Sequence, residues 1–466
     1  AVPKRQRAAL HERFADWLVS ALGEDAPDEI VGYHLEQAFR YGAELGAPVP
    51  VLGERAAERL ASAGRAARSR RDVAAAVNLL GRAVELLQDG ARRPGLLVDL
   101  GESLHAAGDT TGAQAALEES MSIAATAGDR HVEWLARLEL AMIRLEREPE
   151  GAAEAALHEG EAAVTASEAA DDHEVLARAW DLIAEGHNIR GQMADWRRAS
   201  ERALAHARQT GDLGLEVRLV VRAAGPIVFG PVPVEEALRH ADDVLARLGH
   251  VPEIQGFALH VQAHMRARLG GFEGAFEAVM AWRHHKRELG QEVMYALTAG
   301  CVWDVCLWAE DWVRGEEALR EARELLEGMG NKAYLSTISA DLGEAVYQQG
   351  RLDEAEGLSE MSEELGASDD VYNETAWRRL RAKVLAARGD LGGAERLARQ
   401  AVEVARGAGF LDDAALSWLA LAGILRDAGD PGSQTAAAES FALFERKGNL
   451  VGARRAREFL DATTDD

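Results

Sequence analysis

The chain contains few residues that interrupt helices and few large rings. Only 11 of its 466 residues are proline, none lies between Pro252 and Pro431, and aromatic residues make up 6%. Proline breaks helices because it lacks an N–H group and clashes with the preceding turn. Ala, Leu, Glu and Arg, which favour helices, dominate instead. The composition therefore predicts long helices that pack closely through a core made mostly of Ala and Leu.

Positive charge is also scarce. Lys and Arg number 52 against 78 Asp and Glu, which gives a net charge of -26. A protein that binds nucleic acid or an anionic membrane needs a basic face. The basic runs Lys4–Arg7 and Arg68–Arg71 are short, and we interpret them as solvated helix faces, with a local docking patch as the alternative. We therefore expect neither nucleic acid nor a membrane as a partner.

Cysteine usage and hydropathy both predict a cytoplasmic protein. Cys301 and Cys306 are five residues apart, so they fall on different faces of a helix and are expected to be buried, reduced thiols. The longest apolar stretch, Ala414–Leu425, has 12 residues, whereas a membrane span needs about 20. No secretory segment opens the sequence. The first residue is Ala, which indicates either processing or a piece of a longer chain.

A short frame recurs along the sequence. In Ala340–Ala355 a small residue, Gly343, is followed seven residues later by Gly350 and five residues after that by Ala355. Similar frames occur in Asp99–Ala113, Gln262–Ala275 and Arg381–Ala394. The turn position of the frame can be followed at intervals of 37 to 43 residues through Arg71, Gly108, Glu148, Gly191, Gly230, Gly270, Glu310, Gly350, Gly389 and Gly429. Such a period indicates stacked helical repeats.

Each position of the frame has a physical role. The glycine ends the first helix in a left-handed turn that a β-carbon would resist. An aspartate often follows, as at Asp390 and Asp430, where it can cap the second helix. The small residues let the two helices cross closely, and the leucines around them face neighbouring repeats. A single helix pair cannot bury its apolar face, so stability must come from stacking.

This frame resembles the tetratricopeptide repeat, although a period near 40 residues exceeds the usual 34 or so. The resemblance covers about Val51 to Leu460 and implies an all-α fold, a right-handed α-solenoid of about ten helix hairpins. Repeats of this length resemble the sensor arms of signal-transducing ATPases with numerous domains (STAND ATPases) and of large LuxR-type regulators. The resemblance implies a protein or peptide partner.

The N-terminal segment carries a second resemblance. The sequences HERFADWL at His11–Leu18 and DEIVGYHLEQA at Asp28–Ala38 are similar to the junction between a nucleotide-binding module and its repeat arm. Related multidomain proteins often carry an adenylate or guanylate cyclase domain. The match implies that an ATPase or cyclase module is attached in the complete protein.

The sequence predicts three regions. Residues 1–48 form a helical junction segment, 49–449 the repeat solenoid, and 450–466 a capping helix, Leu450–Ala462, with a frayed tail, Thr463–Asp466. The irregular segment Gly225–Pro233 contains three prolines and two glycines, so it is expected to be an elongated turn. A tolerated loop insertion and a functional hinge remain its two interpretations.

Motifs for catalysis are missing from the sequence. It holds no GxxxxGK[ST], GxSxG, HExxH or paired CxxC pattern, so we expect no catalytic residues and no cofactor. His260 and His264, four residues apart on one helix, could reach one metal ion, but the sequence shows no third ligand and ordinary packing is favoured. We also expect Trp303 to pack beside Gly315, with a small hydrophobic-ligand niche as the alternative.

Candidate binding residues follow from the resemblance, because first helices line the concave face of such arrays. These positions are Asp181, Glu185, His260, His264, Asp304, Glu344, Tyr347, Arg379 and Lys383. They are acidic early and basic late, which could orient an extended peptide, although plain solvated charges would give the same pattern. Only Arg379 and Lys383 resemble the carboxylate clamp of co-chaperones, so that function is disfavoured.

We therefore expect a regulatory, ligand-sensing interaction arm of an ATP-dependent signalling protein, without catalysis of its own. The alternative is a free-standing scaffold or adaptor. A hidden metal site at His260 and His264 is the third hypothesis.

Overall fold

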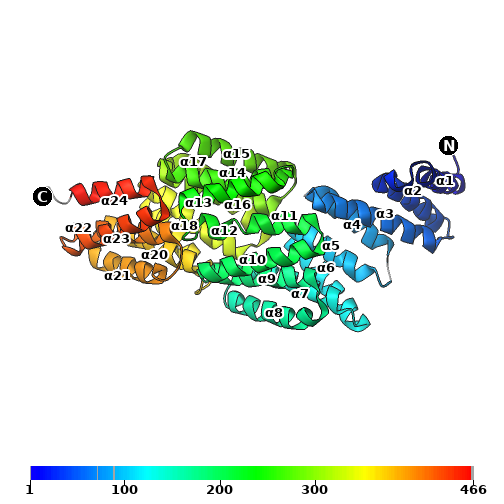
Figure 1. Ribbon diagram of the computed structural model, residues 1–466, viewed down its shortest axis with the longest axis horizontal. Helices are drawn as coiled ribbons and strands as arrows, with labels where there is room; N and C mark the ends of the chain where they lie inside the picture. Colours follow the sequence, from blue (N-terminus) through cyan, green and yellow to red (C-terminus); the bar gives the residue numbers. More distant parts are fainter. Residues whose placement is uncertain (1, 71, 88–89, 463–466) are drawn as a thin grey trace. The chain divides into compact units, whose positions relative to one another are not determined.

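The computed structural model describes residues 2–70, 72–87 and 90–462. Every named secondary-structure element in those ranges is a helix, and none is a strand. The predicted all-α helical-repeat solenoid is therefore confirmed (Figure 1). The expected turn at Arg71 and the expected frayed tail Thr463–Asp466 lie outside the described residues.

The chain divides into two compact units, with the boundary inside helix α7. The first comprises Ala1–Leu140 with Glu288–Gln291, and the second comprises Ala141–Arg287 with Glu292–Asp466. The helices up to the boundary are α1 (Lys4–Leu22), the 3₁₀ turn η1 (Gly23–Asp25), α2 (Asp28–Glu44), α3 (Pro50–Ser69), α4 (Val73–Leu86), α5 (Arg93–Ala106), α6 (Thr110–Ala127) and α7 (Arg130–Arg147).

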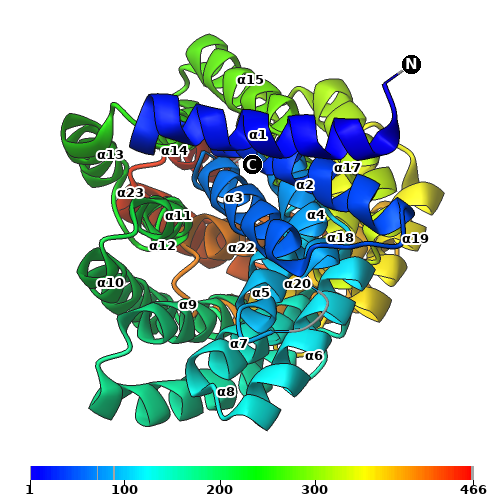
Figure 2. The same ribbon diagram turned by 90° about the vertical axis from the view of Figure 1, so that its right-hand side faces the viewer.

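The second unit contains the remaining repeats. Consecutive helices such as α9 and α10 or α22 and α23 lie side by side (Figures 1 and 2). Its helices are α8 (Ala152–Ser167), η2 (Glu168–Ala170), α9 (His173–Ile189), α10 (Met193–Thr210), α11 (Leu213–Arg222), α12 (Gly225–Val228), α13 (Val234–Leu248), α14 (Pro252–Arg268), α15 (Phe272–Glu288), α16 (Glu292–Ala309), α17 (Trp312–Met329), α18 (Lys332–Gln348), α19 (Leu352–Leu365), α20 (Val371–Ala387), α21 (Leu391–Ala405), α22 (Leu411–Asp427), α23 (Gly432–Lys447) and α24 (Leu450–Ala462).

Seven of the nine predicted turn positions in the described ranges have the left-handed backbone; Glu148 and Gly230 do not, and near Glu148 the left-handed residue is Gly151, with a φ of 70°. The predicted glycines Gly108, Gly191, Gly270, Gly350, Gly389 and Gly429 have φ between 65° and 89°. Glu310 occupies the same position with a φ of 59°, although it has a β-carbon. Asp390 Oδ1 accepts from Gly393 N–H at 2.9 Å and caps α21, as predicted. The frame therefore marks true helix ends.

Small residues set how closely the helices approach. A β-carbon on Gly343 would lie 2.3 Å from Leu380 of α20, and Ala355 is fully buried on α19. Trp303 fills the space beside Gly315, where an added β-carbon would lie 2.9 Å from its ring. Trp303 is buried in the core, so the predicted packing role is confirmed.

The irregular segment Gly225–Pro233 includes the single helical turn α12 and is joined to the end of α23. Lys447 Nζ donates to the carbonyl oxygens of Val228 and Gly230, both at 2.8 Å, and of Val232 at 2.9 Å. Buried carbonyl groups that no helix satisfies therefore find a partner more than 200 residues away. The second unit thus contacts itself across several repeats.

The final helix, α24, has the predicted bounds and contacts α23 and α14. Arg455 donates to the carbonyl oxygens of Leu307 and Trp308 at 3.0 and 2.9 Å, at the C-terminal end of α16. The last carbonyl groups of a helix have no partner within it and favour a cation. Arg455 therefore stabilises the end of α16. Within the described ranges, no helix combines the length and apolar character needed to cross a bilayer.

Candidate functional site

The nine predicted binding residues lie on helices α9, α14, α16, α18 and α20, which are first helices of their repeats. Most are buried or half-buried. Several of them pair with charged or polar side chains of the next repeat. These residues form what we call the inner ladder, defined by Asp181, Glu185, His260, His264, Asp304, Glu344, Tyr347, Arg379 and Lys383.

The early, acidic part of the inner ladder faces a single arginine. Arg222, at the end of α11, donates through Nε to Asp181 at 2.7 Å and through Nη2 to Glu185 at 3.1 Å. Asn188 also donates to Glu185 at 3.0 Å. The two carboxylates on α9 are therefore neutralised in part by the next repeat.

The central part is a buried network around Arg268. Its guanidinium, 2% exposed, lies 2.6 Å from Asp304 of α16 and 2.7 Å from Asp412 of α22. His264 Nδ1 lies 2.5 Å from Asp304 Oδ2. Burial raises the pKa of Asp304, but attraction to Arg268 and His264 outweighs it and holds that pKa well below its usual value. Asp304 is therefore a carboxylate between two donors.

The late, basic part is also paired. Lys383 on α20 lies 2.8 Å from Glu344 on α18, and its Nζ is 5.8 Å from the centre of the Tyr347 ring. Arg379 contacts Asp413 on α22 at 2.5 Å. The acidic and basic residues that the sequence placed in a gradient thus meet opposite charges locally.

Four partners in these pairs were missed by the sequence analysis: Arg222, Arg268, Asp412 and Asp413. A usable signal was present, because opposite charges recur about one repeat apart. Asp181 and Arg222 are 41 residues apart, and Glu344 and Lys383 are 39 residues apart. Side chains one period apart occupy equivalent sites on adjacent first helices, so they can bond across the stack.

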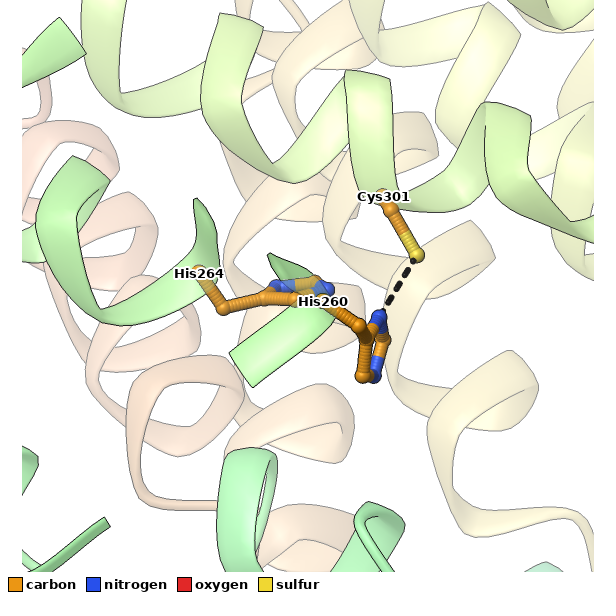
Figure 3. A group of neighbouring side chains, drawn as sticks. All are labelled: His260, His264 and Cys301. Carbon is orange, nitrogen blue, oxygen red and sulfur yellow. Dashed lines mark hydrogen bonds between the residues drawn. The ribbon is translucent and has the colours of Figure 1, made fainter. Parts of the chain in front are cut away.

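His260 and His264 are joined by a third potential ligand, Cys301 of α16 (Figure 3). Cys301 Sγ lies 3.4 Å from His260 Nδ1, and one ligand atom from each of the three residues lies within 4.8 Å of the others. Burial is the main reason that the pKa of His260 lies well below its ordinary value. Burial also raises the pKa of the Cys301 thiol. Both cysteines are buried and unbridged, as expected from their spacing.

The first unit presents an aromatic face on the predicted junction segment. Ala15 and Leu18 of α1 are buried, whereas Phe14 and Trp17 on another face are 41% and 59% exposed. The Phe14 ring lies 5.6 Å from Trp17 and 4.6 Å from His34 of α2, centre to centre. Single exposed apolar residues are ordinary, but a contiguous aromatic group suggests a docking surface.

No family model matches the chain, and no curated protein matches it. Solved structures similar to it include BtubC (BKLC) from P. vanneervenii, at 15% identity and a TM-score of 0.34 over 50% of this chain and 91% of the other. Yeast Tom70 is 12% identical, with a TM-score of 0.31 over 99% and 96%. A human IFIT1 dimer with m7Gppp-AAAA is 12% identical, with a TM-score of 0.40 over 100% and 96%. At these values the similarity does not extend to function.

Proposed function

We propose that this chain is a protein-binding arm that regulates an attached ATP-dependent signalling module, of the ATPase, LuxR-type or cyclase-linked kind, and catalyses no reaction itself. The observation that carries the proposal is the exposed aromatic group Phe14, Trp17 and Tyr33. It lies within the two sequence stretches that resemble a junction with a nucleotide-binding module. An aromatic face at such a junction suits a neighbouring domain.

The inner ladder supports a sensing role for the repeats. Its charges are paired between repeats, at Arg222 with Asp181 and at Lys383 with Glu344, so a partner that competes for one member changes the contact between two repeats. Charged groups across an interface give specificity when the partner offers complementary charge. We propose a protein or peptide partner with both charge signs.

The first experiment is to sequence the coding DNA upstream of Ala1. An open frame that encodes GxxxxGK[ST] supports the regulatory arm. The arm and the upstream module, purified separately, should then bind each other, and Phe14→Ser with Trp17→Ser should weaken binding at least tenfold. Val313→Ser, which changes an equally exposed side chain on α17, is the control.

A start codon directly before Ala1 overturns the attached module and favours a free-standing scaffold or adaptor. The same double variant then tests whether the aromatic face binds a separate protein. Nucleotide hydrolysis by the purified chain itself contradicts the non-catalytic assignment.

A further inference from the structure

The inner ladder contains a buried nitrogen without a partner. His264 is fully buried, and within the described ranges its Nε2 atom has no hydrogen-bond partner. Its other nitrogen, Nδ1, donates to the Asp304 carboxylate at 2.5 Å. In a neutral ring with Nδ1 protonated, Nε2 carries a free lone pair. A buried polar atom without a partner normally costs stability, so it calls for an explanation.

The free nitrogen belongs to a group of metal-ligating side chains. In Figure 3 the His264 ring extends from α14 toward His260 and Cys301. His260 lies on the same helix, one turn before His264. Cys301 comes from α16, which contacts α14. Two imidazoles and a thiol are a ligand set that Zn²⁺ favours over Mg²⁺ or Ca²⁺.

We propose that His260, His264 and Cys301 form a binding site for Zn²⁺ or a similar nitrogen- and sulfur-preferring divalent ion, with a water molecule as the fourth ligand. Binding converts the Cys301 thiol to a thiolate and releases its proton to solvent, while the two histidines bind as neutral imidazoles. Three protein ligands with one exchangeable position also permit a further ligand to reach the ion.

The distances suit this assignment. Tetrahedral zinc with bonds of about 2.0–2.3 Å places its ligand atoms roughly 3.5 Å apart. The Cys301–His260 separation of 3.4 Å already matches, and the upper limit of 4.8 Å for the group needs only side-chain movement. Asp304 would act as a positioning residue, because a carboxylate on the second ring nitrogen of a ligating histidine fixes its tautomer and orientation.

The site would connect metal binding to the repeats. Asp304 also contacts Arg268, which pairs with Asp412 of α22. A change at His264 is thus three contacts from α22, a helix four repeats later. The inference is independent of the proposed attached module, because it concerns the repeat unit alone.

The test uses the untagged chain of residues 1–466, freed of metal with a chelator. Titration calorimetry with Zn²⁺ should show one ion bound per chain, and Co²⁺ should give the near-ultraviolet absorption of a cobalt–thiolate bond. Cys301→Ser should remove that absorption, and both Cys301→Ser and His264→Gln should weaken Zn²⁺ binding by more than about 100-fold. Zn²⁺ should raise the melting temperature of the unaltered chain but not that of Cys301→Ser or His264→Gln.

Matched controls separate ligation from folding. Cys306→Ser removes the other buried thiol of α16, and His284→Gln removes an exposed histidine of α15. Both should retain stoichiometric binding and the cobalt–thiolate band. The absence of stoichiometric Zn²⁺ binding by the unaltered chain, or binding that survives Cys301→Ser unchanged, overturns the site. Circular dichroism of each variant confirms that it is folded before titration.

Discussion

Lys447 Nζ donates to the main-chain oxygen of Gly230 at 2.8 Å, although the two residues are 217 positions apart. Lys447 ends α23, and Gly230 lies in the loop between α12 and α13. The same ammonium group reaches Val228 and Val232. A lysine buried among carbonyl groups therefore holds a segment of the second unit in which helical hydrogen bonding is interrupted.

Replacing Lys447 should destabilise the second unit. Lys447→Met fills a similar volume but leaves buried carbonyl oxygens without a donor. Because each such group costs about 1–3 kcal/mol, we expect a loss of about 2–4 kcal/mol, measured as a lower midpoint in urea unfolding. Arg446→Met changes the adjacent exposed residue and should leave the midpoint nearly unchanged. Equal effects of the two substitutions contradict a role for the carbonyl contacts.

The local architecture could be predicted because it depends on residues close in sequence. Gly350 and Gly389 take the left-handed backbone that the frame predicted, and α24 spans the predicted Leu450–Ala462. A turn glycine and its following cap act within a few residues, so the sequence displays them directly. The same reasoning explains why Trp303 could be placed beside Gly315.

Contacts between distant repeats could not be predicted in the same way. Arg268 and Asp412 are 144 residues apart, and their meeting depends on small rotations accumulated over several repeats. The pairing of Cys301 with His260 was missed because only the spacing between the two cysteines was considered; the 41-residue separation of Cys301 and His260 is about one repeat and could have indicated it. The candidate binding positions could be placed on first helices, and a partner one repeat away, such as Arg222 for Asp181, could have been predicted from the period.

The Arg268 network should be essential for stability. Arg268→Met leaves the Asp304 and Asp412 carboxylates without their shared cation in a buried setting. Removing one partner of a buried ion pair typically costs about 3–5 kcal/mol, and we expect a loss in that range. Thermal unfolding followed by circular dichroism measures it. Arg266→Met, an exposed change two residues earlier on α14, is the control. A melting temperature that matches this control argues against a buried, paired Arg268.

Asp341 should make stability depend on pH. Burial raises its pKa to about 7, and the effect is opposed by the hydroxyl of Tyr372, which donates at 2.9 Å, and by Arg379, while Asp413 and Asp304 reinforce it. The folded state therefore binds a proton that the unfolded state releases above pH ~4. The stabilisation that the protonated Asp341 gives the folded state is fully present below that pH and is lost as the pH rises toward 7.

Stability should accordingly fall across pH 4–7 by up to about 1.4 kcal/mol per pH unit from this group. Asp341→Asn removes this proton exchange and should make that part of the curve less steep, as measured by urea midpoints at several pH values; Asp370, whose pKa burial also raises to about 7, keeps its own contribution. Asp427→Asn, an exposed acid on α22, should leave the slope unchanged. An unchanged slope in Asp341→Asn shows that another group carries the dependence.

Glu310 should be more strained than the residues at equivalent turns. It has a φ of 59°, whereas Gly350 at the next turn has 80° and no β-carbon. A left-handed conformation costs a residue with a β-carbon roughly 1–2 kcal/mol, partly offset by the greater freedom of unfolded glycine. Glu310→Gly should therefore be about 1 kcal/mol more stable than Glu310→Ala.

Both Glu310 variants lose the ion pair with Arg455, whose charged atoms are 3.1 Å apart. The difference between the two variants therefore does not include the energy of that ion pair. Gly350→Ala supplies the opposite change and should destabilise by about 1 kcal/mol, since its φ is unfavourable for alanine even though no atom lies within 4 Å of an added β-carbon. Urea midpoints of all three variants measure these effects. Equal midpoints for Glu310→Gly and Glu310→Ala mean that the turn backbone accommodates a β-carbon, and that the conformation of this turn does not require glycine.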